Sequence, residues 1–288
     1  MPEQDWLAQR FEAQRPRMRA VAYRMLGSLS EADDAIQDAW LRVSRAGAEG
    51  VDNFEAWLTT VVARVALNML RSRRTRREVP METQLPEPIL DRPGTIDPEH
   101  EALLADSVGL AMLVVLETLS PPERLAFVLH DMFGMPFSQI APMVDRSPAA
   151  ARQLASRARR RVRTTAPSPD ADPGTQRRVM DAFLTAARAG DLAALVEVLD
   201  PEVVLRVDTP HGTREARGAQ EVAGRAVSFS VHGVTVHRAT VNGLPGGLTV
   251  KDGRVLSLGS GIVRGGRIVF LHIVADPSRL AHLDLSRL

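Results

Sequence analysis

Apolar residues recur at intervals of three and four through the first 80 residues of the chain. After Ser30, the run EADDAIQDAWLRVSR predicts an amphipathic helix with Ser30 as its N-cap. A second helix is predicted over NFEAWLTTVVARVALNMLRSRR, where Asp52 and Glu55 form a capping-box pattern. The apolar face of the first helix comprises Ala32, Ile36, Ala39, Trp40 and Val43.

A second group of helical patterns lies between residues 105 and 165. The run LADSVGLAMLVVLETL is apolar nearly all round, which predicts a buried helix. Ser120 and Glu123 form a capping box with proline at the first helical position, opening ERLAFVLHDMFG. FSQIAPMV, a turn at Asp145 and a capped AAARQLASRARRRVR then follow. A short helix, a tight turn and a longer helix are typical of a helix-turn-helix.

The last of these helices has two chemically distinct faces. One side is apolar and can pack on the preceding helices, whereas the other carries Arg152, Gln153, Ser156, Arg157 and Arg160. Glutamine can read adenine and arginine can read guanine in a major groove, so this side is predicted to contact DNA. A plain amphipathic surface helix would alternate in the same way and stays an alternative. The apolar side comprises Ala151, Leu154, Ala155, Ala158 and Val162.

Beyond residue 175, the pattern changes to two helices followed by strands. The helices break at Gly190-Asp191, and a third helix is predicted over GAQEVAGRAVSFS. Asp252-Gly253 and Gly265-Gly266 are typical hairpin turns. A helical hairpin against a curved antiparallel sheet predicts an α+β cone with an open mouth. The predicted later strands are 233–242, 247–251, 254–263 and 267–275.

Composition excludes several classes of protein. The chain of 288 residues has no cysteine, which excludes disulfides, thiolate zinc sites and iron–sulfur clusters. No apolar run approaches the roughly 18 residues that span a bilayer, and the first residues lack the pattern of a signal peptide. We therefore expect a cytoplasmic protein without a membrane partner, a metal or a cofactor.

The distribution of charged residues along the chain leads to a different prediction about nucleic-acid binding from the one that the net charge gives. With 36 basic and 35 acidic residues the net charge is +1, which by itself argues against a nucleic-acid partner. However, residues 64–77 hold six arginines and residues 146–163 hold seven, and neither stretch contains an acid. Ten acids lie between them, in residues 78–123. The two basic blocks therefore favour phosphate binding.

Over roughly residues 7–165, the chain resembles bacterial RNA polymerase sigma factors of the extracytoplasmic-function (ECF) class. SEADDAIQDAWLRV is similar to the polymerase-binding helix of region two, and FEAWLTTVVARVALNMLRSRRTRR to its promoter-melting part. LSPPERLAFVLHDMFGMPFSQIAPMVDRSPAAARQLASRARRRVR is similar to region four. The resemblance implies two all-α domains that bind core RNA polymerase and promoter DNA.

The resemblance also implies residue roles. Core polymerase would be bound by Asp34, Gln37, Asp38 and Leu41. The −10 element would be bound by Asn53, Thr60, Arg64, Asn68, Arg71, Arg73 and Arg74. The −35 element would be bound by Arg152, Gln153, Ser156, Arg157 and Arg160.

The remainder of the chain resembles the SnoaL-like, cystatin-type fold, and the whole resembles the SigJ-type ECF subgroup. QLPEP at 84–88 and DPSRLAHL at 276–283 are similar to motifs of that subgroup, whereas its aspartate-glycine-rich motif is replaced by VDTPHGTREA, which keeps Asp208. In this subgroup the extension regulates the sigma factor. The implied domains are region two at 1–78, an acidic proline-rich linker at 79–104, region four at 105–165, a linker at 166–174 and a SnoaL-like regulatory domain at 175–288.

The leading hypothesis is an alternative sigma factor that directs promoter-specific transcription initiation, regulated in cis through contacts between its C-terminal and sigma domains. A ligand-responsive helix-turn-helix regulator that works without polymerase stays open as the second hypothesis, and an enzyme fused to a DNA-binding module as the third. Asp208 and His211 are candidate pocket residues for a small-molecule ligand. No catalytic residue is predicted, because no pair of the acids and histidines of this region has a spacing that guarantees that the two side chains converge.

Overall fold

The structure is a computed structural model that describes residues 2–76, 87–92, 110–165, 172–228, 234–281 and 283. The chain divides into two compact units. The first unit comprises residues 1–87, 98–106 and 112–165, and the second comprises 88–97, 107–111 and 166–288. Most of the two predicted linkers, 79–104 and 166–174, lies outside the described residues. Within the described part of the chain, no helix is both long enough and apolar enough to cross a membrane.

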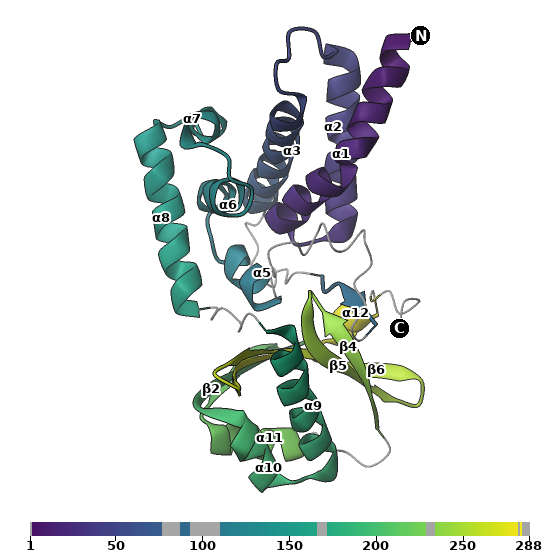
Figure 1. The fold of residues 1–288 in the computed structure, drawn as a ribbon, viewed down its shortest axis with the longest axis vertical. Coiled ribbons are helices and arrows are strands. Elements are labelled where there is room, and N and C mark those ends of the chain that lie inside the picture. The colour runs from purple at the N-terminus through teal and green to yellow at the C-terminus, as the bar shows by residue number, and fades with distance from the viewer. Residues whose placement is uncertain are drawn as a thin grey trace. The chain divides into compact units, whose positions relative to one another are not determined.

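The described part of the first unit is helical, as its sequence predicts (Figure 1). Three long helices pack together through their apolar faces, and a set of shorter helices leads into the last long one. The long helices are α1 (Pro2–Leu26), α2 (Leu29–Ala46) and α3 (Phe54–Arg76). The others are α5 (Leu110–Glu117), α6 (Pro121–Phe127), α7 (Phe137–Ile140) and α8 (Pro148–Thr165), with a π-helical turn at Val128–Met132 after α6.

The helix starts correct two sequence predictions. The N-cap of α2 is Ser28, whose hydroxyl accepts a 3.3 Å hydrogen bond from the amide of Glu31, so the expected cap at Ser30 is wrong. Asn53 caps α3 by accepting a 3.0 Å bond from the amide of Ala56, in place of the expected Asp52. In both cases several polar residues compete within one turn, and tertiary packing selects among them. The capping box at the start of α6 is confirmed.

The second unit is an α+β fold with one seven-stranded sheet. The strand order is β1-β4-β5-β6-β7-β2-β3, and β2 and β7 are a parallel pair within an otherwise antiparallel sheet. The strands are β1 (Leu90–Asp91), β2 (Leu199–Thr209), β3 (Gly212–Arg217), β4 (Thr235–Val241), β5 (Leu244–Lys251), β6 (Arg254–Arg264) and β7 (Arg267–Val274). The helices are α9 (Pro173–Ala189), α10 (Leu192–Val198), α11 (Ala219–Ser228) and α12 (Pro277–Leu280).

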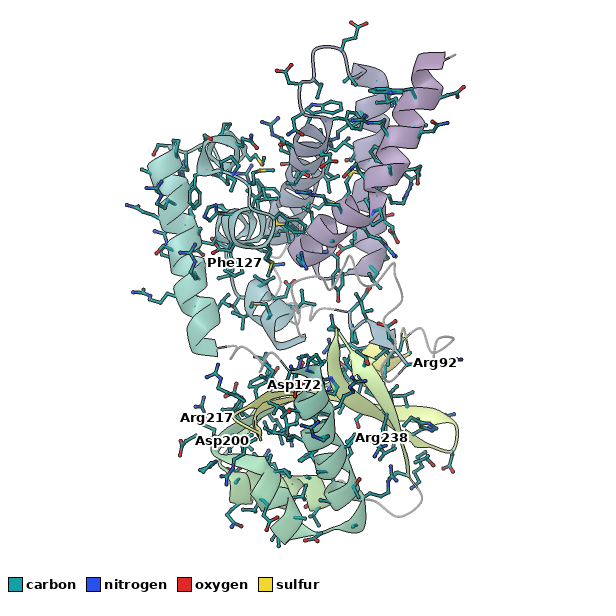
Figure 2. The ribbon with its side chains drawn as sticks, in the orientation of Figure 1. Arg92, Phe127, Asp172, Asp200, Arg217 and Arg238 are labelled. Carbon is teal, nitrogen blue, oxygen red and sulfur yellow. The ribbon has the colours of Figure 1, made fainter. Side chains whose placement is uncertain are left out.

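The sheet separates two apolar clusters, because successive side chains of a strand point to opposite faces. Helices α9, α10 and α11 cover one face, where Leu195 and Val222 are fully buried (Figure 1). On the other face, Leu258 and Val274 pack with Leu280 of α12. Charged side chains such as Arg217 are exposed at the outside of this unit (Figure 2).

The α+β class is confirmed, with two strands that the sequence analysis did not predict. The turns Asp252-Gly253 and Gly265-Gly266 have positive φ at both residues, as the predicted hairpins require. Strand β3 was not predicted because five of its six residues are exposed, so it shows no apolar alternation. Strand β1 comes from the first linker and pairs with β4. A two-residue strand has no periodicity that a sequence could reveal.

Candidate functional site

Helix α8 presents the two faces that its sequence predicts. Ala151, Ala155, Ala158 and Val162 are buried. The opposite face is exposed to solvent and carries the polar and basic residues predicted to read the −35 element. These residues are Arg152, Gln153, Ser156, Arg157 and Arg160. The polar face of α8 is therefore exposed to solvent, as its sequence predicts.

Ion pairs hold α8 against the helices that precede it. Arg157 Nε lies 3.2 Å from Glu123 Oε1, and Arg159 lies 2.7 Å from Asp131. Partial burial raises the pKa of Glu123, but hydrogen bonds from Ser120 and Arg157 outweigh it, so that the pKa lies below its ordinary value. The side chain of Arg157 is still 56% exposed. It is therefore both oriented by Glu123 and accessible to solvent.

Helix α2 carries an exposed patch that contains an apolar residue. Leu41 is 46% exposed, although residues of this type are usually buried, and Asp34 and Gln37 are exposed beside it. Asp38 is half-buried and pairs with Arg42 at 2.8 Å. The opposite face of the helix packs on α1 and α3. We call Asp34, Gln37, Asp38 and Leu41 the α2 patch.

The residues predicted to bind the −10 element differ in their accessibility. Arg64, Asn68 and Arg71 are exposed on α3. By contrast, the side-chain oxygen of Asn53 caps α3, and the hydroxyl of Thr60 donates a 2.9 Å bond to the carbonyl of Ala56. Three of the predicted residues therefore lie together on an open face, and two others make hydrogen bonds within their own helix.

The two remaining arginines of this set stand apart. The side chain of Arg73 is 17% exposed, forms an ion pair with Glu31 and donates a 3.2 Å bond to the carbonyl of Leu26. It thereby joins the end of α3 to α1 and α2. The side chain of Arg74 lies outside the described residues. The charge pattern of a sequence does not show which arginines are buried and paired within the protein, so Arg73 could not be separated from its exposed neighbours before the structure was known.

In the second unit, Asp208 lies at the centre of a buried polar cluster. Its carboxylate accepts a 2.6 Å hydrogen bond from His272 Nε2 and a 2.8 Å bond from the hydroxyl of Thr213. Arg279 of α12 lies 3.3 Å away, and Arg206 lies at 3.5 Å. Burial raises the pKa of Asp208, but the bonds and charges of these neighbours lower it to about 2. Asp208 therefore joins β2, β3, β7 and α12 as a carboxylate.

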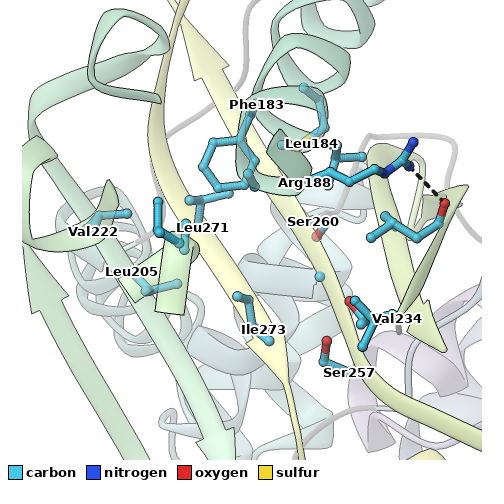
Figure 3. A pocket seen from close by; sticks show the side chains of 18 of the residues that line it. Phe183, Leu184, Arg188, Leu205, Val222, Val234, Ser257, Ser260, Leu271 and Ile273 are labelled. Carbon is cyan, nitrogen blue, oxygen red and sulfur yellow. Dashed lines mark hydrogen bonds between the residues drawn. The ribbon is translucent and has the colours of Figure 1, made fainter. Parts of the chain in front are cut away.

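The same unit contains a cavity of about 550 Å³ between the helices and the sheet (Figure 3). Its walls are mainly apolar, with Phe183 and Leu184 from α9, Val222 from α11, and Leu271 and Ile273 from β7. The polar side chains among its lining residues are Arg188, Thr249, Ser257 and Ser260.

Neither candidate pocket residue lines this cavity. Asp208 and His272 alternate along their strands with residues on the cavity side, such as Leu271 and Ile273, and so lie on the opposite face of the sheet. His211 is exposed in the turn between β2 and β3. Among the described residues, no cluster of three or more acids and histidines is placed to hold a metal ion.

Glu87 of the linker motif QLPEP, and Ile89 just after the motif, each have defined partners in their own unit. In the first unit, the carboxylate of Glu87 accepts bonds of 2.9 Å from the Ser28 hydroxyl and 2.8 Å from the Leu29 amide. In the second unit, Ile89 and Asn242 exchange two hydrogen bonds, the amide of each donating to an oxygen of the other. The motif is recognisable in the sequence, but these contacts depend on residues that are distant along the chain.

Comparisons with known proteins agree with this architecture. A family model described as Sigma-70 region 2 matches residues 10–76, and one described as Sigma-70, region 4 matches residues 110–162. The ECF RNA polymerase sigma factor SigJ of Mycobacterium tuberculosis is 36% identical over 291 residues, covering 93% of this chain and 91% of that protein. The probable ECF RNA polymerase sigma factor SigI of the same species is 34% identical over 281 residues, covering 97% of each.

A solved structure extends the likeness to the fold. The crystal structure of Mycobacterium tuberculosis SigJ matches with a TM-score of 0.73 at 33% sequence identity, and the match covers 95% of this chain and 98% of that one. It therefore includes the α+β unit as well as both helical regions, as the predicted resemblance to the SigJ-type subgroup requires. Because the likeness in sequence and fold spans nearly the whole chain, the protein belongs to the ECF RNA polymerase sigma factors.

Proposed function

We propose that this protein binds core RNA polymerase through the α2 patch and directs promoter-specific transcription initiation. The observation that carries the proposal is the exposed Leu41 among the acidic and polar residues of α2. An apolar side chain ringed by polar ones is typical of an interface, and acids suit a basic partner surface. A helix-turn-helix repressor that works alone needs no such patch. Since core polymerase is cytoplasmic in bacteria, the proposal places the chain in the cytoplasm.

Promoter contacts are proposed for two surfaces. On α8, we expect Gln153 and Arg160 to read bases and Arg152 to contact phosphates, and the exposure of all three side chains supports contact with DNA. On α3, Arg64, Asn68 and Arg71 would hold the single-stranded −10 element. Asn53, Thr60 and Arg73 would support this surface through the bonds they make within the unit. Holding two weak DNA-binding surfaces on one polymerase raises the effective concentration of each at a promoter.

We further propose that the α+β unit regulates the sigma regions in cis, through the described part of the first linker, residues 87–92. Glu87 is held by Ser28 and Leu29, at the start of the helix that carries the α2 patch. Two residues later, Ile89 is held by Asn242 at the turn after β4. A conformational change in the α+β unit that moved Ile89 could therefore be transmitted along the backbone to Glu87, two residues earlier, and from there to the start of α2. Such a change would be set by a small-molecule ligand or by a protein contact, without catalysis.

The decisive experiment is transcription in vitro with core RNA polymerase and a promoter library, using the full chain and a chain truncated after Thr165. We expect promoter-specific transcripts, and a different level of transcript from the two chains. If neither chain yields specific transcripts, the sigma function is wrong and regulation without polymerase remains. If both chains give the same transcripts at the same level, control in cis is wrong.

A further inference from the structure

The cavity of the α+β unit has the size and lining of a small-molecule site. Its volume of about 550 Å³ lies within the roughly 300–1,000 Å³ of ligand pockets. Phe183, Leu184 and Leu271 contribute apolar surface from the helix and the sheet (Figure 3). An occupant would bury apolar surface against these side chains, and removing that surface from water favours binding. A molecule that fits this lining therefore has an apolar body.

Two glycines leave part of the sheet wall without side chains. Gly247 of β5 and Gly259 of β6 are direct partners across the two strands, and both line the cavity. A Cβ atom at Gly247 would lie 2.9 Å from the carbonyl oxygen of His237, which is too close for a side chain. Glycine inside a strand often marks a place where another group approaches the backbone closely. At Gly247 the approaching groups include Leu184 of α9 and Val236 of β4, whose side chains would lie 3.4 and 3.5 Å from such a Cβ, so this glycine leaves room for the apolar side chains that line the cavity.

The charged residue in the lining indicates which charge a bound molecule would carry. Among the lining residues that the structure describes, Arg188 alone is ionisable. Arg188 is exposed at the end of α9, and its Nη2 donates a 3.2 Å bond to the carbonyl of Val236 (Figure 3). The guanidinium is thus held between α9 and β4, at the rim of the cavity. A fixed cation beside an apolar cavity without acids complements an anion.

We propose that this cavity binds an apolar molecule that carries one anionic group, such as a carboxylate, at its end. The apolar body lies against the side chains of α9, α11 and β7, and the carboxylate pairs with Arg188 at the rim. The hydroxyls of Thr249 and Ser257, which line the same cavity, serve other polar atoms of the ligand. Binding itself requires none of the sigma function. Its consequence for transcription rests on the proposed control in cis.

Calorimetric titration of the full chain tests the charge preference. The probes are decanoate, decan-1-ol and decylammonium, which share one apolar chain and differ in charge. We expect decanoate to bind most tightly and decylammonium most weakly. Arg188→Gln should weaken decanoate binding about tenfold, which corresponds to about 1.4 kcal/mol, and leave decanol binding unchanged. The matched control is Arg178→Gln, which removes an arginine of the same helix that is 74% exposed and does not line the cavity.

A second pair of variants tests the location. Ala226→Trp and Ala187→Phe fill the cavity from α11 and α9 respectively, and each is checked for folding by its thermal unfolding midpoint. A folded variant of either kind should lose both decanoate and decanol binding. Unchanged binding in a folded, filled variant would overturn the site. Equal affinities of the wild-type chain for decanoate and decanol, with no effect of Arg188→Gln, would overturn the anionic preference.

The transcription assay separates this inference from the proposed function. If decanoate binds as expected and neither chain yields specific transcripts, the site stands and the sigma function is wrong. If transcripts form but none of the three probes binds the full chain up to its solubility limit, the proposed ligand class is wrong and the sigma function stands. Calorimetry and transcription are measured on the same full-length protein.

Discussion

Asp208 and His272 form a buried pair in which the Nε2 atom of His272 lies 2.6 Å from the carboxylate of Asp208. Both side chains are at most 2% exposed. The other ring nitrogen, Nδ1, is buried and has no hydrogen-bond partner among the described residues. A protonated imidazole would bury that N–H without an acceptor, whereas a neutral ring with its proton on Nε2 satisfies Asp208. The pair therefore joins β2 to β7 as a carboxylate and a neutral histidine.

This pair predicts how the stability of the protein depends on mildly acidic pH. Burial lowers the pKa of His272 and the neighbouring Asp208 raises it, with a net lowering from the ordinary value of 6.5. Below pH 6.5 the unfolded chain then binds a proton that the folded chain does not, so stability falls as the pH falls. The loss is at most about 1.4 kcal/mol per pH unit.

The test is His272→Gln, which keeps a neutral donor near Asp208 and cannot titrate. The free energy of unfolding of both chains is measured by denaturant titration between pH 7 and pH 5. We expect the wild type to lose stability relative to the variant over this range. A gain of stability by the wild type as the pH falls would mean that His272 is protonated in the folded state, and would contradict the neutral pair.

Asp208→Asn should destabilise the α+β unit at neutral pH. The folded-state pKa of Asp208, about 2, lies below its ordinary value of 3.8, so the charged carboxyl contributes about 2 kcal/mol at pH 7. This contribution is lost as the pH falls from about 3.8 towards about 2, because the folded carboxyl is then protonated as well. Denaturant unfolding at pH 7 measures the difference.

A surface aspartate supplies the control for Asp208. Asp181 pairs with Arg238 at 2.9 Å, but the two side chains are 44% and 53% exposed. Asp181→Asn should therefore cost less than about 1 kcal/mol. Equal losses from Asp181→Asn and Asp208→Asn would show that the buried cluster adds no stability beyond that of a surface ion pair.

Leu41→Arg should weaken binding to core RNA polymerase without destabilising the protein. The side chain is 46% exposed, so arginine fits without repacking, but it replaces the apolar centre of the α2 patch with a positive charge. We expect a loss of at least about tenfold in affinity, measured by fluorescence anisotropy with labelled sigma factor. The control is Leu192→Arg on α10, which changes a leucine that is 44% exposed in the other unit. Equal affinities of the two variants would exclude the α2 patch from the interface.

Substitutions on α8 should separate base reading from phosphate contact. Arg157→Ala or Arg160→Ala should cost roughly 1–3 kcal/mol of discrimination at one promoter position if the side chain reads a base. Binding of the holoenzyme to single-base promoter variants measures this cost. A uniform weakening across all promoter variants would instead assign the residue to the phosphate backbone. Arg178→Ala, on α9, should change neither the discrimination between bases at any promoter position nor the overall affinity of the holoenzyme for promoter DNA.

Much of the architecture could be predicted because it depends on local sequence. The buried face of α8 follows from the spacing of its alanines and valine, and the hairpin turns follow from Asp252-Gly253 and Gly265-Gly266, where positive φ favours glycine. Helix starts were less predictable, since Ser28 and Ser30 are equally good caps in isolation. Strand β3 has no apolar alternation and was recognisable only from its pairing with β2.

The sequence by itself determined the helical class of the first unit and the α+β class of the second, the separation of charge into two basic blocks, and the outward face of α8. Only the tertiary structure decided which polar residues are accessible and which are partners. It joined Asp208 to His272 across 64 positions of sequence, tied Arg73 to Glu31, and left Arg188 beside an apolar cavity. The physical reason is that periodicity reports which face of an element is buried. The neighbours of a buried polar group are set by strand pairing and packing between segments that are distant in sequence.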